Sequence, residues 1–104
     1  MNISDIRVRR TFEDNKMKAL VSVTFDDTLA LHDIKIIDGA DGMFVAMPSR
    51  KDEKGIFRDI AHPITPEFRV ELEQAVLEAY DRHIRLENAL NEPERQLEEP
   101  TLGM

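Results

Sequence analysis

The sequence predicts an α+β domain in which an antiparallel β-sheet of about five strands precedes one long C-terminal helix. Apolar residues alternate with polar ones over most of residues 3–61, and they recur at helical spacing from Phe68 to Tyr80. A chain of 104 residues without cysteine has a small core that disulfides cannot supplement. Because pairing two copies buries more apolar surface, we also expect a homodimer that forms through the sheet.

The first two predicted strands form a hairpin. Ile6, Val8 and Phe12 share one parity, which is the period of a half-buried strand. Residues 17–25 carry an apolar side chain at every second position and are the second strand. Residues 13–16 (Glu-Asp-Asn-Lys) form the turn between them, because Asp and Asn tolerate a positive φ.

The third predicted strand covers residues 28–37 and follows a turn at Asp26-Asp27. Its apolar parity changes along its length, since Leu29 has an odd number and Ile34 an even one. One extra residue in a strand shifts the alternation by one position. We therefore expect a β-bulge near His32-Asp33.

Two apolar runs, Met43–Met47 and Ile56–Ala61, flank a charged loop, and we expect them to be the arms of a β-hairpin with an exposed tip. The first run shows no alternation, which is typical of a central strand or of a strand covered on both faces. Pro48 ends it because proline has no N–H to donate. An open edge this apolar would invite aggregation, and pairing with a second copy removes the edge. The residues predicted to form the dimer interface are Met43, Phe44, Val45, Ala46 and Met47.

The long helix is predicted to begin at Pro66, with Thr65 as its N-cap, and to end at about His83. Its apolar stripe is expected to cover one face of the sheet. Residues 1–84 therefore form a single α+β domain. Residues 85–104 are acidic, contain two prolines and offer few core residues, so we expect a disordered tail.

The net charge of −7 argues against a nucleic-acid partner, but its distribution changes that conclusion. Residues 1–62 hold ten basic and eleven acidic residues, whereas residues 63–104 hold four and ten. The excess acid is C-terminal, so basic residues nearer the N-terminus can form a local positive patch. No stretch approaches the roughly 18 apolar residues of a membrane span. We expect a cytoplasmic protein without a membrane partner.

The strongest basic cluster lies on the predicted hairpin, where four Lys and Arg residues fall within residues 50–58. Such side chains on an exposed tip contact phosphates, or a base edge if the tip enters a groove, and the alternative is a solvated loop of mixed charge. The same alternatives apply to Arg7, Arg9 and Arg10. For these residues, the solvent-exposed face of a strand is favoured over a binding surface. The predicted nucleic-acid-binding residues are Arg50, Lys51, Lys54, Arg58 and Arg69.

His32-Asp33 also suggests a metal-ligand pair that Asp59 and His62 would complete. A metal hydrolase needs about three or four convergent ligands and a position open to water. Adjacent side chains on a bulge diverge, so hydrogen bonds that fix the bulge are the favoured interpretation. The chain has no glycine-rich phosphate loop after a strand and no nucleophile elbow. We expect no enzyme activity, no metal and no cofactor.

Several motifs follow one another at a spacing that is similar to a known family. They are His32-Asp33, Gly39, Gly42 through Ser49 (GMFVAMPS), and Gly55 through Ile64 (GIFRDIAHPI). Together they resemble the signature of the bacterial stage V sporulation protein G family, over residues 1 to about 84. The family's basic pair corresponds to Arg50-Lys51, here in Arg-Lys order where Lys-Arg is usual. The charge is kept, so contacts to phosphate are expected before contacts to individual bases.

The resemblance implies a small α+β fold that dimerises through its sheet, nucleic-acid binding and regulatory roles, without enzyme activity or cofactor. We therefore expect a bacterial regulatory protein that binds DNA and, as a second candidate, RNA. The resemblance links such a protein to sporulation, asymmetric septation and global gene regulation. The alternative is a protein-binding adaptor of the septation machinery that makes no direct nucleic-acid contact. No small-molecule substrate is expected.

Overall fold

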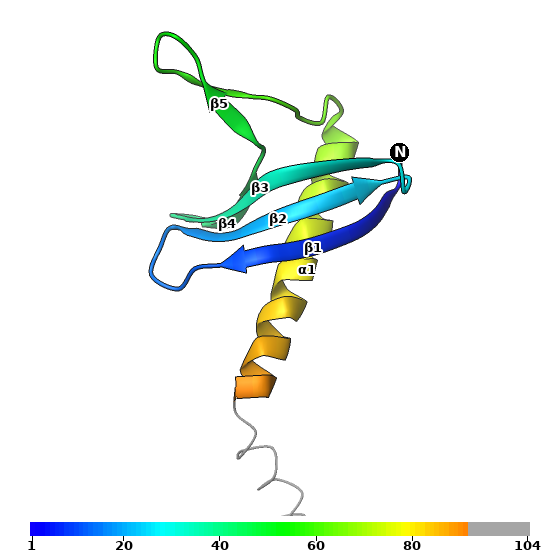
Figure 1. Ribbon diagram of the computed structural model, residues 1–104, viewed down its shortest axis with the longest axis vertical. Helices are drawn as coiled ribbons and strands as arrows, with labels where there is room; N and C mark the ends of the chain where they lie inside the picture. The colour runs from blue at the N-terminus through cyan, green and yellow to red at the C-terminus, as the bar shows by residue number, and fades with distance from the viewer. Residues whose placement is uncertain (92–104) are drawn as a thin grey trace, which may run out of the picture.

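The computed structural model describes residues 1–91 and contains a four-stranded antiparallel sheet, a separate two-stranded ribbon and one long helix (Figure 1). The elements in chain order are β1 (Ile3–Thr11), β2 (Met17–Phe25), β3 (Leu29–Gly39), β4 (Gly42–Ala46), β5 (Ser49–Lys51), β6 (Phe57–Asp59) and α1 (Pro66–Asn91). The predicted α+β class is confirmed. Within the described residues, no helix is long and apolar enough to span a membrane.

The main sheet is a meander with the order β1-β2-β3-β4, so each strand pairs with its neighbour in the sequence. The turn between β2 and β3 has only two central residues, Asp26 and Asp27, with φ angles of 51° and 52°. The N–H of Thr28 donates to the carbonyl of Phe25 at 2.9 Å and closes this turn. Positive φ at both central residues matches the twist of the flanking strands, and it explains the Asp-Asp pair.

The predicted bulge near His32-Asp33 is confirmed. Val21 pairs with Ile34 and Val23 with Leu31, which leaves two residues of β3 opposite one residue of β2. Asp33 has a φ of 64°, a conformation that Asp accepts more readily than most residues. The bulge restores the alternation, so the apolar side chains on both sides of it point into the core.

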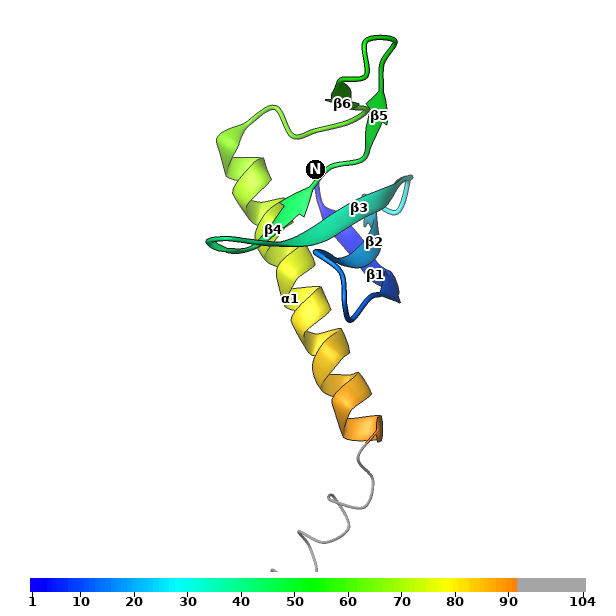
Figure 2. The ribbon, with the colours of Figure 1, turned by 90° about the vertical axis from the view of Figure 1, so that its left-hand side faces the viewer.

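The core lies between the sheet and α1, which crosses one face of the sheet (Figure 2). Leu72 and Val76 of α1 are fully buried against the apolar face formed by β2, β3 and β4. The helix packs chiefly on β1 and β4. At its N-terminal end, the ring of Phe68 lies 5.9 Å from the ring of Phe25. The predicted apolar stripe of the helix is therefore the stripe that the sheet covers.

The helix begins where the sequence predicts. Thr65 is the N-cap, because its hydroxyl accepts a hydrogen bond from the N–H of Phe68 at 3.2 Å. Pro66 occupies the first helical position, where a missing N–H has no cost.

The helix ends later than predicted, at Asn91 instead of about His83, so residues 85–91 are not part of a disordered tail. Two side-chain contacts, each between residues four apart, support this extension. Arg85 binds Asp81 at 2.9 Å, and His83 lies 3.5 Å from Glu87. Such i, i+4 pairs stabilise a helix without adding to its apolar stripe, which is why a count of apolar residues missed them. The rest of the predicted tail, residues 92–104, lies outside the described residues.

The prediction that Met43–Met47 and Ile56–Ala61 are the two arms of one hairpin is wrong. Residues 42–46 pair with β3 and form an edge strand of the main sheet, not a central one. Their lack of alternation reflects two different surroundings, because Val45 faces the core while Phe44 is exposed. The chain leaves the sheet at Pro48, which cannot continue the ladder. A shorter ribbon then forms from β5 and β6 alone.

Candidate nucleic-acid interface

The ribbon of β5 and β6 stands away from both the sheet and the helix (Figures 1 and 2). Three residue pairs form it: Ser49 with Asp59, Arg50 with Arg58, and Lys51 with Phe57. At its base, the N–H of Ile60 donates to the carbonyl of Pro48 at 2.8 Å. Arg50 and Lys51 therefore lie on a strand, whereas the sequence placed them on a loop.

The tip of the ribbon is a tight turn between Asp52 and Ile56. The N–H of Asp52 donates to the carbonyl of Ile56 at 2.9 Å, and the N–H of Gly55 donates to the carbonyl of Asp52 at 3.0 Å. Gly55 has a φ of 82°, which a residue with a Cβ rarely adopts. This is a three-residue hairpin loop with glycine at the position that demands left-handed backbone.

The carboxylate of Asp52 holds the tip together. Its Oδ1 accepts the N–H groups of Lys54 at 2.8 Å and Ile56 at 2.9 Å. Its Oδ2 accepts the Nε–H of Arg58 at 2.8 Å. The hydrogen bond from Arg58 is the largest of the effects that lower the pKa of Asp52 from 3.8, and the backbone N–H groups lower it further. Asp52 therefore orders the tip and fixes the side chain of Arg58.

Arg50 and Arg58 lie directly opposite each other on the two strands of the ribbon. Opposite residues in an antiparallel pair have Cβ atoms about 5 Å apart and point to the same face. Two arginines that share one face at this spacing of their Cβ atoms bring like charges near each other, and an anion bound between them offsets the repulsion. Asp52 offsets the charge of Arg58, while Arg50 has no carboxylate partner among residues 1–91. The pair is therefore suited to binding an additional anionic group such as phosphate.

Lys51 and Phe57 form the next pair of the ribbon. The ammonium of Lys51 lies 5.7 Å from the centre of the Phe57 ring, and the Phe57 side chain is 67% exposed. An exposed aromatic ring beside cations is typical of surfaces on which nucleic-acid bases stack. Sequence reasoning missed Phe57 as a site residue, because it was counted as an apolar member of a predicted strand.

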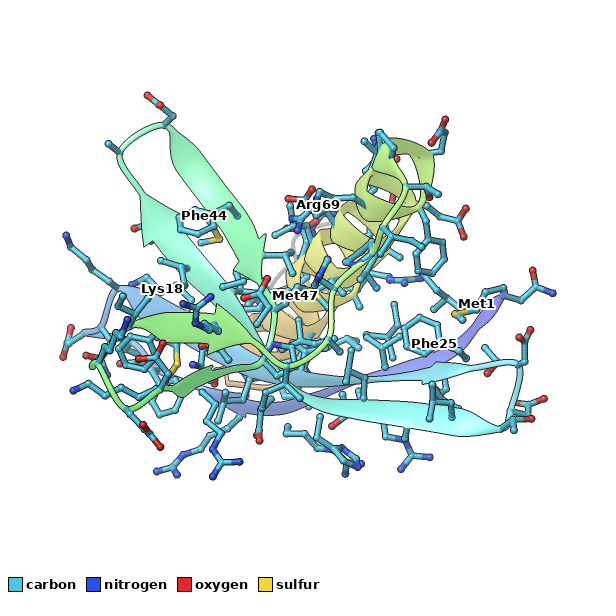
Figure 3. The ribbon with its side chains drawn as sticks, turned by 90° about the horizontal axis from the view of Figure 1, so that it is seen from above. Met1, Lys18, Phe25, Phe44, Met47 and Arg69 are labelled. Carbon is cyan, nitrogen blue, oxygen red and sulfur yellow. The ribbon has the colours of Figure 1, made fainter. Side chains whose placement is uncertain are left out.

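The predicted cations do not all lie together. The ribbon brings four of them together: Arg50, Lys51, Arg58 and, at the tip, Lys54. Arg69 lies in the first turns of α1, and no hydrogen bond or ion pair of the described residues links its side chain to the ribbon (Figure 3). The candidate site is therefore the ribbon, and Arg69 is not part of that cluster.

The residues predicted for the dimer interface divide into two groups. Val45 and Met47 are buried in the core of their own chain and Ala46 is half-buried, whereas Met43 and Phe44 are 42% and 45% exposed. The ring of Phe44 lies against Gly39, where an added Cβ would come within 2.9 Å of it. The exposed pair and the open edge of β4 are the parts of this run that a second chain can reach.

A second feature of the surface is an apolar cleft of about 610 Å³ near the start of α1. Phe25, Leu31, Met47 and Phe68 contribute to its walls, and Figure 3 shows Met1, Phe25 and Met47 around it. The segment at Ile64 forms its rim, and the side chain of Ile64 is almost fully exposed. The sequence did not indicate this cleft, because its walls come from separate parts of the chain.

The metal ligands considered from the sequence are not brought together. Nδ1 of His32 lies 2.8 Å from the hydroxyl of Ser22, and His62 contacts the carbonyl of Pro63. Within residues 1–91, no three His, Asp or Glu side chains form a group that could hold a metal ion. The hypothesis of a metal hydrolase at His32, Asp33, Asp59 and His62 has no site in the described part of the chain.

Comparison with known proteins gives the family. The SpoVG family model matches residues 1–82. A relative from Clostridioides difficile, named "Putative septation protein SpoVG", is 59% identical over 80 residues, which cover 77% of this chain and 87% of the relative. Relatives of the same name from Alkaliphilus oremlandii and Macrococcus caseolyticus are 52% and 46% identical over 93 and 102 residues.

The alignments cover most of every chain compared. They span 88% of this chain and all of the A. oremlandii protein, and 95% of this chain and 89% of the M. caseolyticus protein. The alignments with both relatives therefore extend beyond residue 84, where the similarity was expected to end, whereas the family model ends at residue 82. A family model over most of the chain, together with relatives at these identities, shows that the chain belongs to the SpoVG family.

Proposed function

We propose that this protein is a nucleic-acid-binding regulator that binds the phosphate backbone of DNA or RNA through its β5–β6 ribbon. The observation that carries the proposal is the opposition of Arg50 and Arg58 on a ribbon that projects from the domain. Lys51 and Lys54 add positive charge on the same short segment, and Asp52 fixes its shape. Cations held on a projecting, ordered element suit contact with a long polyanion.

The names of the relatives support a role in septation or sporulation, since all three proteins compared are named as septation proteins. A regulator of this kind acts by binding nucleic acid, so it needs binding groups more than it needs catalytic groups. The ribbon offers guanidinium and ammonium groups and one exposed aromatic ring. These groups bind phosphates and stack on bases, and they supply neither a nucleophile nor a general base at neutral pH.

We further propose that the protein acts as a homodimer joined at the open edge of β4. An edge strand presents unpaired N–H and C=O groups, and Met43 and Phe44 add exposed apolar surface beside it. A dimer carries two ribbons, so a second contact forms at high effective concentration once the first has formed. Sedimentation equilibrium of the purified protein tests this part of the proposal, and a strictly monomeric protein refutes it.

The test of the proposed function is the salt dependence of binding in the double variant Arg50→Ala/Lys51→Ala. The probes are a short fluorescent DNA duplex of mixed sequence and a single-stranded RNA of the same sequence. Each lost phosphate contact lowers the magnitude of the slope of log K against log salt by about 0.9 for duplex DNA, so we expect a decrease of about 1.8 for each ribbon that contacts the duplex. Thermal unfolding should not change, because both side chains are exposed.

The matched control is Arg82→Ala/Arg85→Ala, which removes the same charge from the exposed side of α1. It should keep the wild-type slope. If the wild-type protein binds neither probe at about 50 mM salt, nucleic-acid binding is refuted. If it binds and the ribbon variant keeps the full slope, the ribbon is not the contact.

The alternative function is a protein-binding adaptor of the septation machinery, and the apolar cleft is the observation that favours it. Leu29 lines this cleft and is 58% exposed, so Leu29→Glu alters the cleft without disturbing the core. The adaptor function predicts a defined partner that survives nuclease treatment and is lost in this variant. Loss of every partner after nuclease treatment contradicts it.

A further inference from the structure

The face of the sheet opposite α1 is open, and positive charge gathers on it. Nitrogen-tipped side chains project from this side of the sheet in the lower part of Figure 3. The strand registers identify some of them, because residues that pair across an antiparallel sheet point to the same face. Arg10 of β1 and Lys35 of β3 both pair with Leu20 of β2, and this row lies on the open face.

A bulge in β1 places a further arginine on this face. Val8 pairs with Val21 and Arg10 pairs with Leu20, so Arg9 is the extra residue of the bulge. In a regular strand, neighbouring side chains point to opposite faces. The bulge lets both Arg9 and Arg10 point away from the core.

Ser22 fixes the two side chains at the centre of the face. Its hydroxyl accepts a hydrogen bond from Nε of Arg9 at 3.2 Å and lies 2.8 Å from Nδ1 of His32. Ser22 is only 6% exposed, so this hydroxyl is held in place by the sheet around it. The Nη groups of Arg9 and Nε2 of His32 make no hydrogen bond or ion pair within residues 1–91, so they are available to a ligand.

Few carboxylates offset the charge of this face. Asp5 lies on it and is engaged by Nε of Arg7 at 2.9 Å, which neutralises that arginine. Arg9, Arg10 and Lys35 have no carboxylate partner within the described part of the chain. Asp33, which is exposed, lies in the β3 bulge next to His32. The face therefore has an excess of cations.

We propose that this open face, with Arg9, Arg10 and Lys35 placed around Ser22 and Leu20, binds phosphate groups of the same nucleic acid that the β5–β6 ribbon contacts. The inference rests on the proposed function and extends its binding surface from the ribbon to the sheet. β1 and β3 flank β2, so their backbones lie about 9 to 10 Å apart. Cations at this spacing are better placed to contact different phosphates along a nucleic-acid chain than to share one small anion.

The open face also changes the interpretation of the arginines near the N-terminus. From the sequence, a solvated strand face was favoured for Arg7, Arg9 and Arg10. The structure places all three on β1 with exposed side chains, as that interpretation expects, and Arg7 is paired with Asp5. For Arg9, the hydrogen bond to the buried Ser22 fixes the guanidinium in one orientation, which lowers the entropy lost when a phosphate binds.

The experiment compares the salt dependence of binding of a short fluorescent DNA duplex to four proteins. They are the wild type, the open-face variant Arg10→Gln/Lys35→Gln, the ribbon variant Arg50→Ala/Lys51→Ala, and the control Arg82→Gln/Arg85→Gln. Neither Arg10 nor Lys35 donates a hydrogen bond within residues 1–91, but Cζ of Arg10 lies 5.1 Å from the centre of the Phe12 ring. Losing this contact at an exposed arginine should lower the unfolding temperature of the open-face variant only slightly. We expect the magnitude of its slope to fall by about 1.8 for each protomer that contacts the duplex. For each lost contact, the variant should then bind about eightfold more weakly than the wild type at 0.1 M salt, and this difference should vanish toward 1 M.

The outcomes separate the two proposals. If the open-face variant has the slope of the wild type and of the control, the inference is overturned while the proposed function stands. If only the open-face variant loses slope, the sheet is the contact surface and the ribbon is not. If the wild type does not bind at about 50 mM salt, both proposals fail. A chemical-shift change of the His32 ring on adding DNA, absent in the open-face variant, is the second supporting result.

Discussion

Asp52 has two opposite effects on the ribbon. Its carboxylate offsets the charge of Arg58, which weakens the attraction of the ribbon for phosphate. The same carboxylate accepts two backbone N–H groups, which orders the tip and holds the two strands together. The sequence showed an aspartate beside a basic pair and suggested only a loop of mixed charge. Its role depends on a tight turn with Gly55 at positive φ, which brings Arg58 back against it.

The pH dependence of the tip follows from the lowered pKa of Asp52. The folded ribbon favours the carboxylate, chiefly through Arg58, so its pKa lies below the 3.8 of an unfolded chain. The stabilisation of the tip is therefore present above that value and is lost as the pH falls through the lower, folded pKa. We expect the amides of Lys54 and Ile56 to stay protected from hydrogen exchange down to pH 3.8 and to lose protection below it. In Asp52→Ala, these amides should exchange fast at every pH, whereas Glu53→Ala is the control. Equal protection in all three proteins contradicts this account.

At the scale of elements, the sequence predicts what local chemistry determines. Alternation located the strands of the first hairpin, the parity change located the bulge, and Thr65-Pro66 located the start of the helix. It failed where one segment had two possible partners. Residues 56–61 were expected to pair with residues 43–47 in one hairpin, yet residues 42–46 pair with β3, and only three of residues 56–61 pair, with the short β5. The end of α1 was missed because ion pairs, not apolar residues, support it.

Two leucines of α1 test how the helix is held. Leu72 is 1% exposed against the sheet, whereas Leu86 is 65% exposed beyond it. Leu72→Ala leaves a cavity under the helix and should lower the free energy of unfolding by about 2 to 5 kcal/mol. Leu86→Ala creates no cavity and should change it by less than about 0.5 kcal/mol. Urea denaturation followed by circular dichroism measures both, and similar losses in the two variants would show that the packing of α1 is different.

At the scale of the molecule, the acidic net charge hides a division of charge between surfaces. The excess of acidic over basic residues lies in the sequence from residue 63 onward, while cations gather on the β5–β6 ribbon and on the open face of the sheet. The net charge alone argued against a polyanionic partner. The distribution of charge along the sequence favoured such a partner. The proposed contribution of the sheet could not be predicted, because it depends on the bulge in β1 and on the buried hydroxyl of Ser22, which together orient Arg9.

The most direct test of the central claim is amide hydrogen exchange measured by mass spectrometry with and without saturating nucleic acid. The account predicts that residues 49–59 gain the most protection, since the ribbon meets the phosphate backbone first. The exposed side of α1 should show no change, because its acidic residues repel phosphate. Protection confined to residues 66–91, with the ribbon unchanged, would contradict the account.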